Sequence, residues 1–145
     1  METQIKNKTY LVTNFNTMEY YFSKMVSLSF DEAIIRVTDL LKSEGFGVIS
    51  EIRMHEKLKE KLGVDFKKYT ILGACNPSYA YKALQVEDKI GTMLPCNVIV
   101  QELSENRIEV AAVNPIASMM AIQNPDLIGI AKEVTDKLQV VISRL

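Results

Sequence analysis

The stretch Tyr69-Thr70-Ile71-Leu72-Gly73-Ala74-Cys75-Asn76-Pro77 decides the fold, because it joins a buried strand directly to a helix. Residues 69–74 are apolar on both faces, which is typical of a strand inside a sheet. Asn76 stands where a helix cap is needed, and Pro77 takes the first helical position, where its missing N–H costs nothing. We therefore expect a sheet strand that leads into a helix, with Cys75 at the junction.

The clearest helix lies before this stretch. Ser29 and Glu32 have the spacing of a capping box, in which each side chain bonds the backbone N–H of the other. Gly45 follows the last turn, where a left-handed cap favours glycine. We expect a strand over residues 47–52 and a short amphipathic helix over residues 55–62. The apolar stripe of the first helix comprises Phe30, Ala33, Ile34, Val37, Leu40 and Leu41.

The C-terminal half predicts a hairpin followed by helices. Residues 97–103 and 107–113 alternate as paired strands, whereas residues 85–91 are expected to form a loop. Asn114-Pro115 and Asn124-Pro125 repeat the signal of a cap followed by proline, and the second opens a long helix. The fold class is therefore α/β of the α+β type, with a mixed β-sheet packed by two long helices.

The composition limits the partners and the compartment. Seventeen basic residues are interleaved with eighteen acidic ones, for a net charge of -1. This pattern predicts no nucleic-acid partner and no membrane partner. The chain shows no signal peptide, and two distant cysteines are typical of reduced thiols, so we expect a cytoplasmic protein. Residues 1–17 are interpreted as an N-terminal arm, partly disordered or adding an edge strand, and residues 18–145 as one domain.

The two cysteines stand in Cys-Asn pairs, Cys75-Asn76 and Cys96-Asn97. Cys75 precedes a helix N-terminus, where the dipole favours a thiolate or a bound anion. The alternative is a small apolar residue at the end of a buried strand. The spacing between Cys75 and Cys96 is not that of a redox motif, and a disulfide between them would need Cα atoms within about 7 Å.

The two asparagines carry as much information as the thiols. Helix capping is sufficient to explain Asn76, whereas Asn97 has no comparable structural role. The single histidine, His55, is expected at the surface rather than as a general base. No metal site and no cofactor site are predicted.

Several motifs together resemble the bacterial and archaeal domain-of-unknown-function family numbered 302, in order over residues 18–145. The resemblance implies a compact α/β sandwich with a TATA-box-binding-protein-like topology, often found as a homodimer, and it implies no activity. The motifs are Phe30-Asp31-Glu32-Ala33, Gly45-Phe46-Gly47-Val48, Glu51-Ile52, Lys61-Leu62-Gly63-Val64, Ile71-Leu72-Gly73-Ala74-Cys75-Asn76-Pro77 and Leu94-Pro95-Cys96-Asn97-Val98.

Three functional hypotheses follow from these residues. The leading one is a homodimeric module that binds a small ligand, including anions such as carboxylates or phosphates, at Cys75, Asn76, Cys96 and Asn97. The second is thiol redox or sulfur-transfer chemistry, with Cys75 as the reacting thiol and Cys96 as its partner. The third is a structural or interaction domain without a chemical site. Whether the protein is an enzyme stays open at this point.

Overall fold

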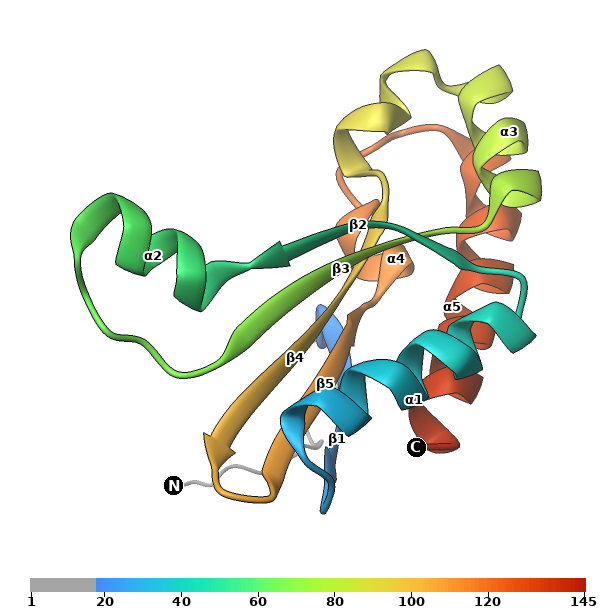
Figure 1. Cartoon of the computed structure of the whole chain (residues 1–145). Helices are drawn as coiled ribbons and strands as arrows, with labels where there is room; N and C mark the ends of the chain where they lie inside the picture. The colour runs from blue at the N-terminus through green and yellow to red at the C-terminus, as the bar shows by residue number, and fades with distance from the viewer. Residues whose placement is uncertain (1–17) are drawn as a thin grey trace.

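The computed structural model describes residues 18–145, and the expected arm over residues 1–17 lies outside this part. A five-stranded sheet forms the centre of the fold, and helices pack on one of its faces (Figure 1). In chain order the elements are β1 (Tyr21–Val26), α1 (Phe30–Ser43), β2 (Gly47–Arg53), α2 (Met54–Leu62), β3 (Tyr69–Cys75), α3 (Pro77–Val86), the 3-10 helix η1 (Asp88–Met93), β4 (Cys96–Ser104), β5 (Arg107–Val113), α4 (Pro115–Ser118), the 3-10 helix η2 (Pro125–Leu127) and α5 (Ile128–Ser143).

The strand order is β1-β5-β4-β3-β2, and all neighbouring strands are antiparallel. The predicted α/β class is confirmed, but the sheet is antiparallel rather than mixed. The reason is that two helical connections return the chain to the end of the sheet that it left. Ala74 at the end of β3 pairs with Cys96 at the start of β4, although α3 and η1 lie between them in the sequence. Among the helices of residues 18–145, only α1 connects the two edge strands, β1 and β2.

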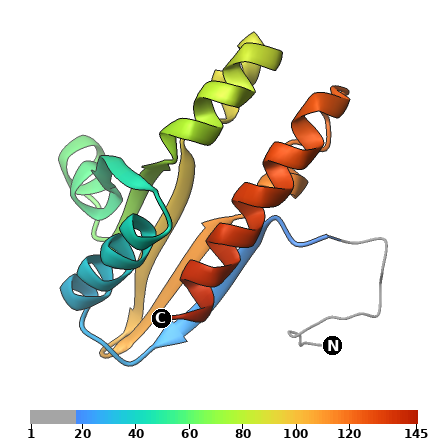
Figure 2. The same cartoon turned by 90° about the vertical axis from the view of Figure 1, so that its right-hand side faces the viewer.

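Helices α1 and α5 lie on the same side of the sheet, as Figure 2 shows. Beneath them, alternate residues of the strands form the main hydrophobic core, and Leu72, Val98 and Val110 are completely buried there. Burying one such side chain contributes about 1.5–3 kcal/mol. We call this the covered face. In residues 18–145 no helix packs on the opposite side of β1, β5 and β4, and we call that side the open face (Figures 1 and 2).

The signals at the ends of α1 are confirmed. The Glu32 N–H donates to Ser29 Oγ at 3.1 Å, and the Ser29 N–H donates to Glu32 Oε1 at 3.1 Å, which completes the capping box. Gly45 has a φ of 89°, in the left-handed region. The turn after α1 therefore requires the left-handed conformation for which glycine was expected at this position.

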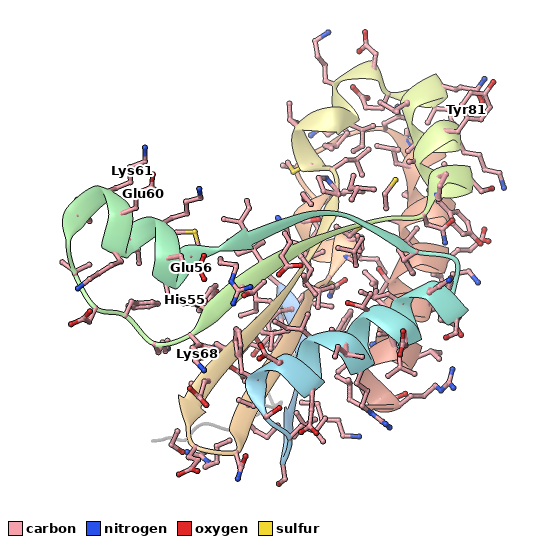
Figure 3. All side chains as sticks on the ribbon, in the orientation of Figure 1. His55, Glu56, Glu60, Lys61, Lys68 and Tyr81 are labelled. Carbon is pink, nitrogen blue, oxygen red and sulfur yellow. The ribbon has the colours of Figure 1, made fainter. Side chains whose placement is uncertain are left out.

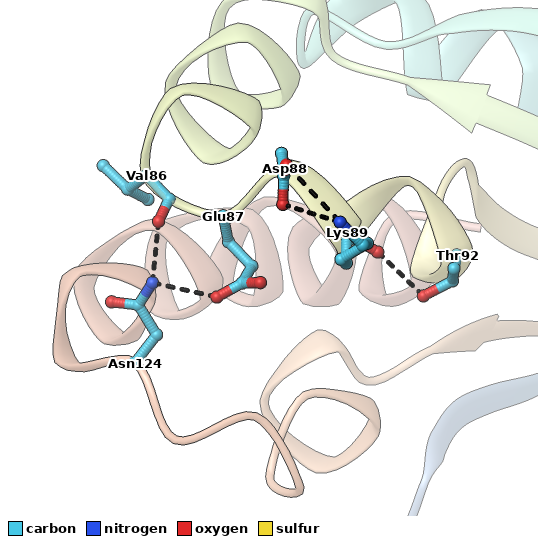
Figure 4. A network of polar contacts seen from close by, with 6 residues as sticks. All are labelled: Val86, Glu87, Asp88, Lys89, Thr92 and Asn124. Carbon is cyan, nitrogen blue, oxygen red and sulfur yellow. Dashed lines mark hydrogen bonds and ion pairs between the residues drawn. The ribbon is translucent and has the colours of Figure 1, made fainter.

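A second, smaller core closes the end of the molecule beyond the sheet. It contains Ala83, Ile90 and Leu127, and it joins α3 and η1 to η2 and α5. The expected loop over residues 85–91 instead contains the end of α3 and the start of η1, because Ile90 is drawn into this core. Asn124 fixes the arrangement, since its Nδ2 donates to Val86 O at 2.8 Å and to Glu87 Oε1 at 3.1 Å (Figure 4).

Helix α2 lies at the other end of the sheet and contains no buried residue. It is held by His55, which is half-buried rather than fully at the surface (Figure 3). The Tyr69 N–H donates to His55 Nδ1 at 3.0 Å, and the imidazole meets the Phe30 ring edge-on with centroids 5.9 Å apart. The histidine is therefore a structural link between α2 and β3. Within residues 18–145, no helix has the length and apolar character needed to cross a membrane.

Candidate functional site

The four predicted site residues do not form one site. Cys75, Asn76 and Cys96 line a narrow cavity between α3 and α5, whereas Asn97 lines a hollow on the open face. Cys96 and Asn97 are consecutive residues of β4, and successive strand side chains point to opposite faces of a sheet. The same alternation that makes Cys96 buried makes Asn97 exposed. The expectation that both Cys-Asn pairs wall one site is therefore corrected.

The thiol cavity lies at the seam between the main core and the smaller one. Its walls include Phe46 and Val134 from the main core and Ala83 and Leu127 from the smaller core. The cavity holds about 40 Å³, and almost all of its surface is apolar. The described residues that line it include no lysine or arginine. An anion would find no cationic side chain there, so the walls do not favour the anionic ligand that the sequence suggested.

The thiols themselves differ in their surroundings. Cys96 is buried and Cys75 is half-buried, and neither forms a disulfide. Burial raises the pKa of the Cys96 thiol to about 11, and the nearby Cys75 adds to this shift. Cys96 is therefore protonated at neutral pH. A protonated, buried thiol is a poor nucleophile, which weakens the thiol-chemistry hypothesis.

Asn76 occupies the predicted cap position of α3, but its side chain makes no capping bond. Its Nδ2 instead donates to Glu44 O at 3.3 Å, and the amide packs beside Gly45. The residue therefore ties the start of α3 to the end of α1. Asn114 and Asn124 do cap through their side chains, accepting from the N–H groups of Ile116 and Asp126 at 3.1 Å and 3.0 Å.

The hollow on the open face is built by the register of three strands. Gln101 of β4 pairs with Glu109 of β5 on one side and Tyr69 of β3 on the other, so these three side chains stand in one row. The next row on the same face contains Ala111 and Ile99. Because the alanine side chain is short, the surface is hollowed over Ala111. The hollow holds about 400 Å³ and is lined by Tyr20, Tyr21, Tyr69, Asn97, Ile99, Gln101, Glu109, Ala111, Ala112 and Val113.

One polar pair in this hollow is incompletely bonded. Gln101 Nε2 donates to Glu109 Oε1 at 2.7 Å, while the buried Gln101 Oε1 has no donor among residues 18–145. Turning the amide over would place its oxygen against the carboxylate, so the orientation in which Nε2 faces Glu109 is the favourable one. A buried acceptor without a donor costs about 1–3 kcal/mol. The pair therefore contains a buried acceptor without a partner beside the Glu109 carboxylate.

Tyrosines surround this pair. Burial raises the pKa of Tyr21, and the charges of Glu19 and Glu109 raise it further. Burial also raises the pKa of Tyr69, with contributions from Tyr20 and Glu109. The carboxylate of Glu109 is therefore close enough to both phenols to influence their ionisation. The hollow carries negative charge and aromatic rings together.

Tyr20 is placed at this hollow by the residue that follows β5. The Asn114 N–H donates to Tyr20 O at 2.8 Å, and Asn114 Nδ2 donates to Glu19 O at 3.0 Å. The rings of Tyr20 and Tyr21 meet edge-on with centroids 4.9 Å apart. The buried Asn114 therefore holds the backbone that positions the exposed Tyr20.

Sequence reasoning found Asn97 but missed Tyr69, Gln101 and Glu109. The alternation of β4 places Asn97, Ile99 and Gln101 on one face, and this signal was present in the sequence. The cross-strand register that brings Glu109 and Tyr69 beside Gln101 was not, because strand order is a property of the whole fold.

Comparisons with known proteins place the chain among proteins without an assigned activity. The family model described as Domain of unknown function DUF302 matches residues 22–145. The crystal structure of an uncharacterized conserved DUF302 protein from Bacillus stearothermophilus superposes with a TM-score of 0.81 and 30% sequence identity, over 88% of this chain and 98% of that chain. No curated protein matches the chain.

Proposed function

We propose, for a chain that belongs to the family Domain of unknown function DUF302, that its function is to bind a small organic molecule in the hollow on the open face. The observation that carries the proposal is the convergence of Asn97, Gln101, Glu109 and three tyrosines on this one hollow. Ligand sites typically combine an apolar floor with a few convergent polar groups.

The size of the hollow supports this choice over the thiol cavity. A volume of about 400 Å³ lies within the usual range of about 300–1,000 Å³ for small-molecule sites. The thiol cavity, at about 40 Å³, has room for only a few atoms. Ligand binding beside the Cys-Asn pairs, as the sequence suggested, is therefore retained for Asn97 and transferred away from Cys75, Asn76 and Cys96.

The remaining hypotheses receive less support. Thiol redox or sulfur transfer would use Cys75 and Cys96, but Cys96 is buried and its pKa is raised to about 11. A purely structural domain would leave the unpaired Gln101 oxygen and the exposed Asn97 without a role. The homodimer implied by the family resemblance stays a prediction, and the open face is a surface that a second copy could also cover.

Matched substitutions in the two cavities test the proposal. Ala111→Leu fills the floor of the hollow, and Ala80→Leu fills the thiol cavity from α3 with the same added volume. A library of small, water-soluble molecules is screened against the wild-type chain by saturation-transfer-difference NMR. For the molecules that bind, we expect Ala111→Leu to weaken binding at least tenfold, since the added side chain occupies the ligand's space, and Ala80→Leu to leave the affinity unchanged.

Thermal unfolding of both variants controls for loss of the fold. If Ala80→Leu removes binding and Ala111→Leu does not, the thiol cavity is the site and the proposal is wrong. If no molecule of the library binds the wild-type chain, the proposal is also contradicted.

A further inference from the structure

We infer that the ligand of the open-face hollow is an organic cation, in which a protonated amine is attached to an apolar body. This inference rests on the proposed function and assigns the chemical class of its ligand. The amine lies against Glu109 and Gln101, and the apolar body lies over Ile99 and Ala111 between the tyrosines.

The charges around the hollow favour a cation. Glu109 is its one charged lining residue within residues 18–145, and Glu19 adds a second carboxylate close enough to influence Tyr21. The lysine of the adjoining strand β1, Lys24, is engaged elsewhere, since its Nζ donates to Ser143 O at 3.0 Å on the covered side. A cation therefore enters a negative site without meeting a basic side chain in the lining.

The hydrogen-bonding groups favour a donor. Gln101 Nε2 donates to Glu109 Oε1 at 2.7 Å, and the buried Gln101 Oε1 has no donor within the described residues. An ammonium group carries three donors and no acceptor, so it suits the carboxylate of Glu109, whose oxygens can accept further hydrogen bonds beside the one from Gln101. A ligand carboxylate or phosphate would bring only acceptors, and negative charge, beside the carboxylate of Glu109.

The tyrosines favour the same class of ligand. A cation within about 6 Å of an aromatic ring is attracted to the ring face, and this attraction grows as water is excluded. Tyr21 stands on β1 and Tyr69 on β3, so the hollow between them has aromatic rings at both ends. Neighbouring rows of side chains on one strand face are about 7 Å apart, which leaves room for a short apolar body beside the amine.

Three probes of nearly equal shape separate charge from size. They are 2-phenylethylammonium, the neutral 2-phenylethanol and the anion 3-phenylpropanoate. Isothermal titration calorimetry and ¹⁵N-resolved NMR measure their affinities for the full chain at neutral pH. We expect the ammonium to bind at least tenfold more tightly than the alcohol, and the anion to bind more weakly than both.

A charge-only variant assigns the effect to one residue. Glu109→Gln keeps the shape of the side chain and removes its charge, so the ammonium should bind this variant only about as tightly as the alcohol does. Glu105→Gln, in the exposed hairpin turn between β4 and β5, removes the same charge away from the hollow and should leave the preference intact.

The outcomes distinguish this inference from the function beneath it. If the alcohol or the anion binds as well as the ammonium, and Ala111→Leu still abolishes binding, the hollow is a ligand site but the cation assignment is overturned. If no probe binds, the cation assignment is also overturned. A wild-type dimer that dissociates in Ile99→Lys and binds no probe would assign the open face to a second copy instead.

Discussion

The two faces of one sheet follow different rules in this molecule. On the covered face, Leu72 and Val98 are completely buried under α1 and α5, and the space left beside Cys96 is narrow and apolar. On the open face, Asn97 and Gln101 line a wide hollow that also contains the carboxylate of Glu109. Consecutive residues thus pack in the core on one side and line the proposed ligand site on the other. The lesson is that the buried Cys96 belongs to the core, while the adjacent Asn97 marks the face of the sheet that carries the proposed ligand site.

The largest expected effect compares two neighbours on β3. Leu72→Ala removes a completely buried side chain, so we expect a loss of about 2–5 kcal/mol in the free energy of unfolding. Ile71→Ala, one residue earlier and on the open face, should cost about 1 kcal/mol because Ile71 is half-buried. Urea unfolding of both variants measures the difference. Equal losses would mean that the open face is packed against something in solution.

The next effect concerns alkaline pH and Cys96. The pKa of its thiol is about 11 in the folded chain against an ordinary value of 9.0. Between these values the unfolded chain has lost a proton that the folded chain keeps, so the free energy of unfolding falls as the pH rises. Integrated over this window, the loss is about 2–3 kcal/mol.

Cys96→Ala isolates this contribution, since tyrosines and lysines titrate equally in both chains. Unfolding is followed in urea at several values between pH 8 and pH 11, and the wild-type chain should lose more stability than the variant. Parallel pH profiles would show that Cys96 is not buried as a protonated thiol. Cys75→Ala, at the half-buried thiol, serves as the matched control.

Much of the covered face could be predicted because its signals are local. The capping box of Ser29 and Glu32, the left-handed Gly45 and the buried strand of β3 depend on residues close in sequence. The mixed sheet was not confirmed, because whether α3 crosses the sheet or returns beside β3 depends on the smaller core around Ile90. The capping bond predicted for Asn76 is absent for a similar reason, because nothing local in the sequence indicates that Glu44 O lies beside its amide.

The open face was predictable only in part. Asn97 stood out because no local role explained it, and it does line the hollow. Its partners come from β1, β3 and β5, and they meet only when the register of the four strands is fixed. Tyr20 adds a further dependence, because its backbone is held by Asn114 from a distant part of the chain. The proposed ligand site is therefore a property of the assembled sheet.

Chemical-shift mapping of bound 2-phenylethylammonium tests the central claim most directly. The full chain, labelled with ¹⁵N, is titrated with the probe while backbone amide signals are followed. We predict that the largest shifts fall on Asn97, Ile99, Gln101 and Glu109 of the open face, and that the amides of Ala80, Ala83 and Ala131 around the thiol cavity stay unchanged. Shifts concentrated around the thiol cavity, or no shifts at all, would contradict the division of roles between the two faces.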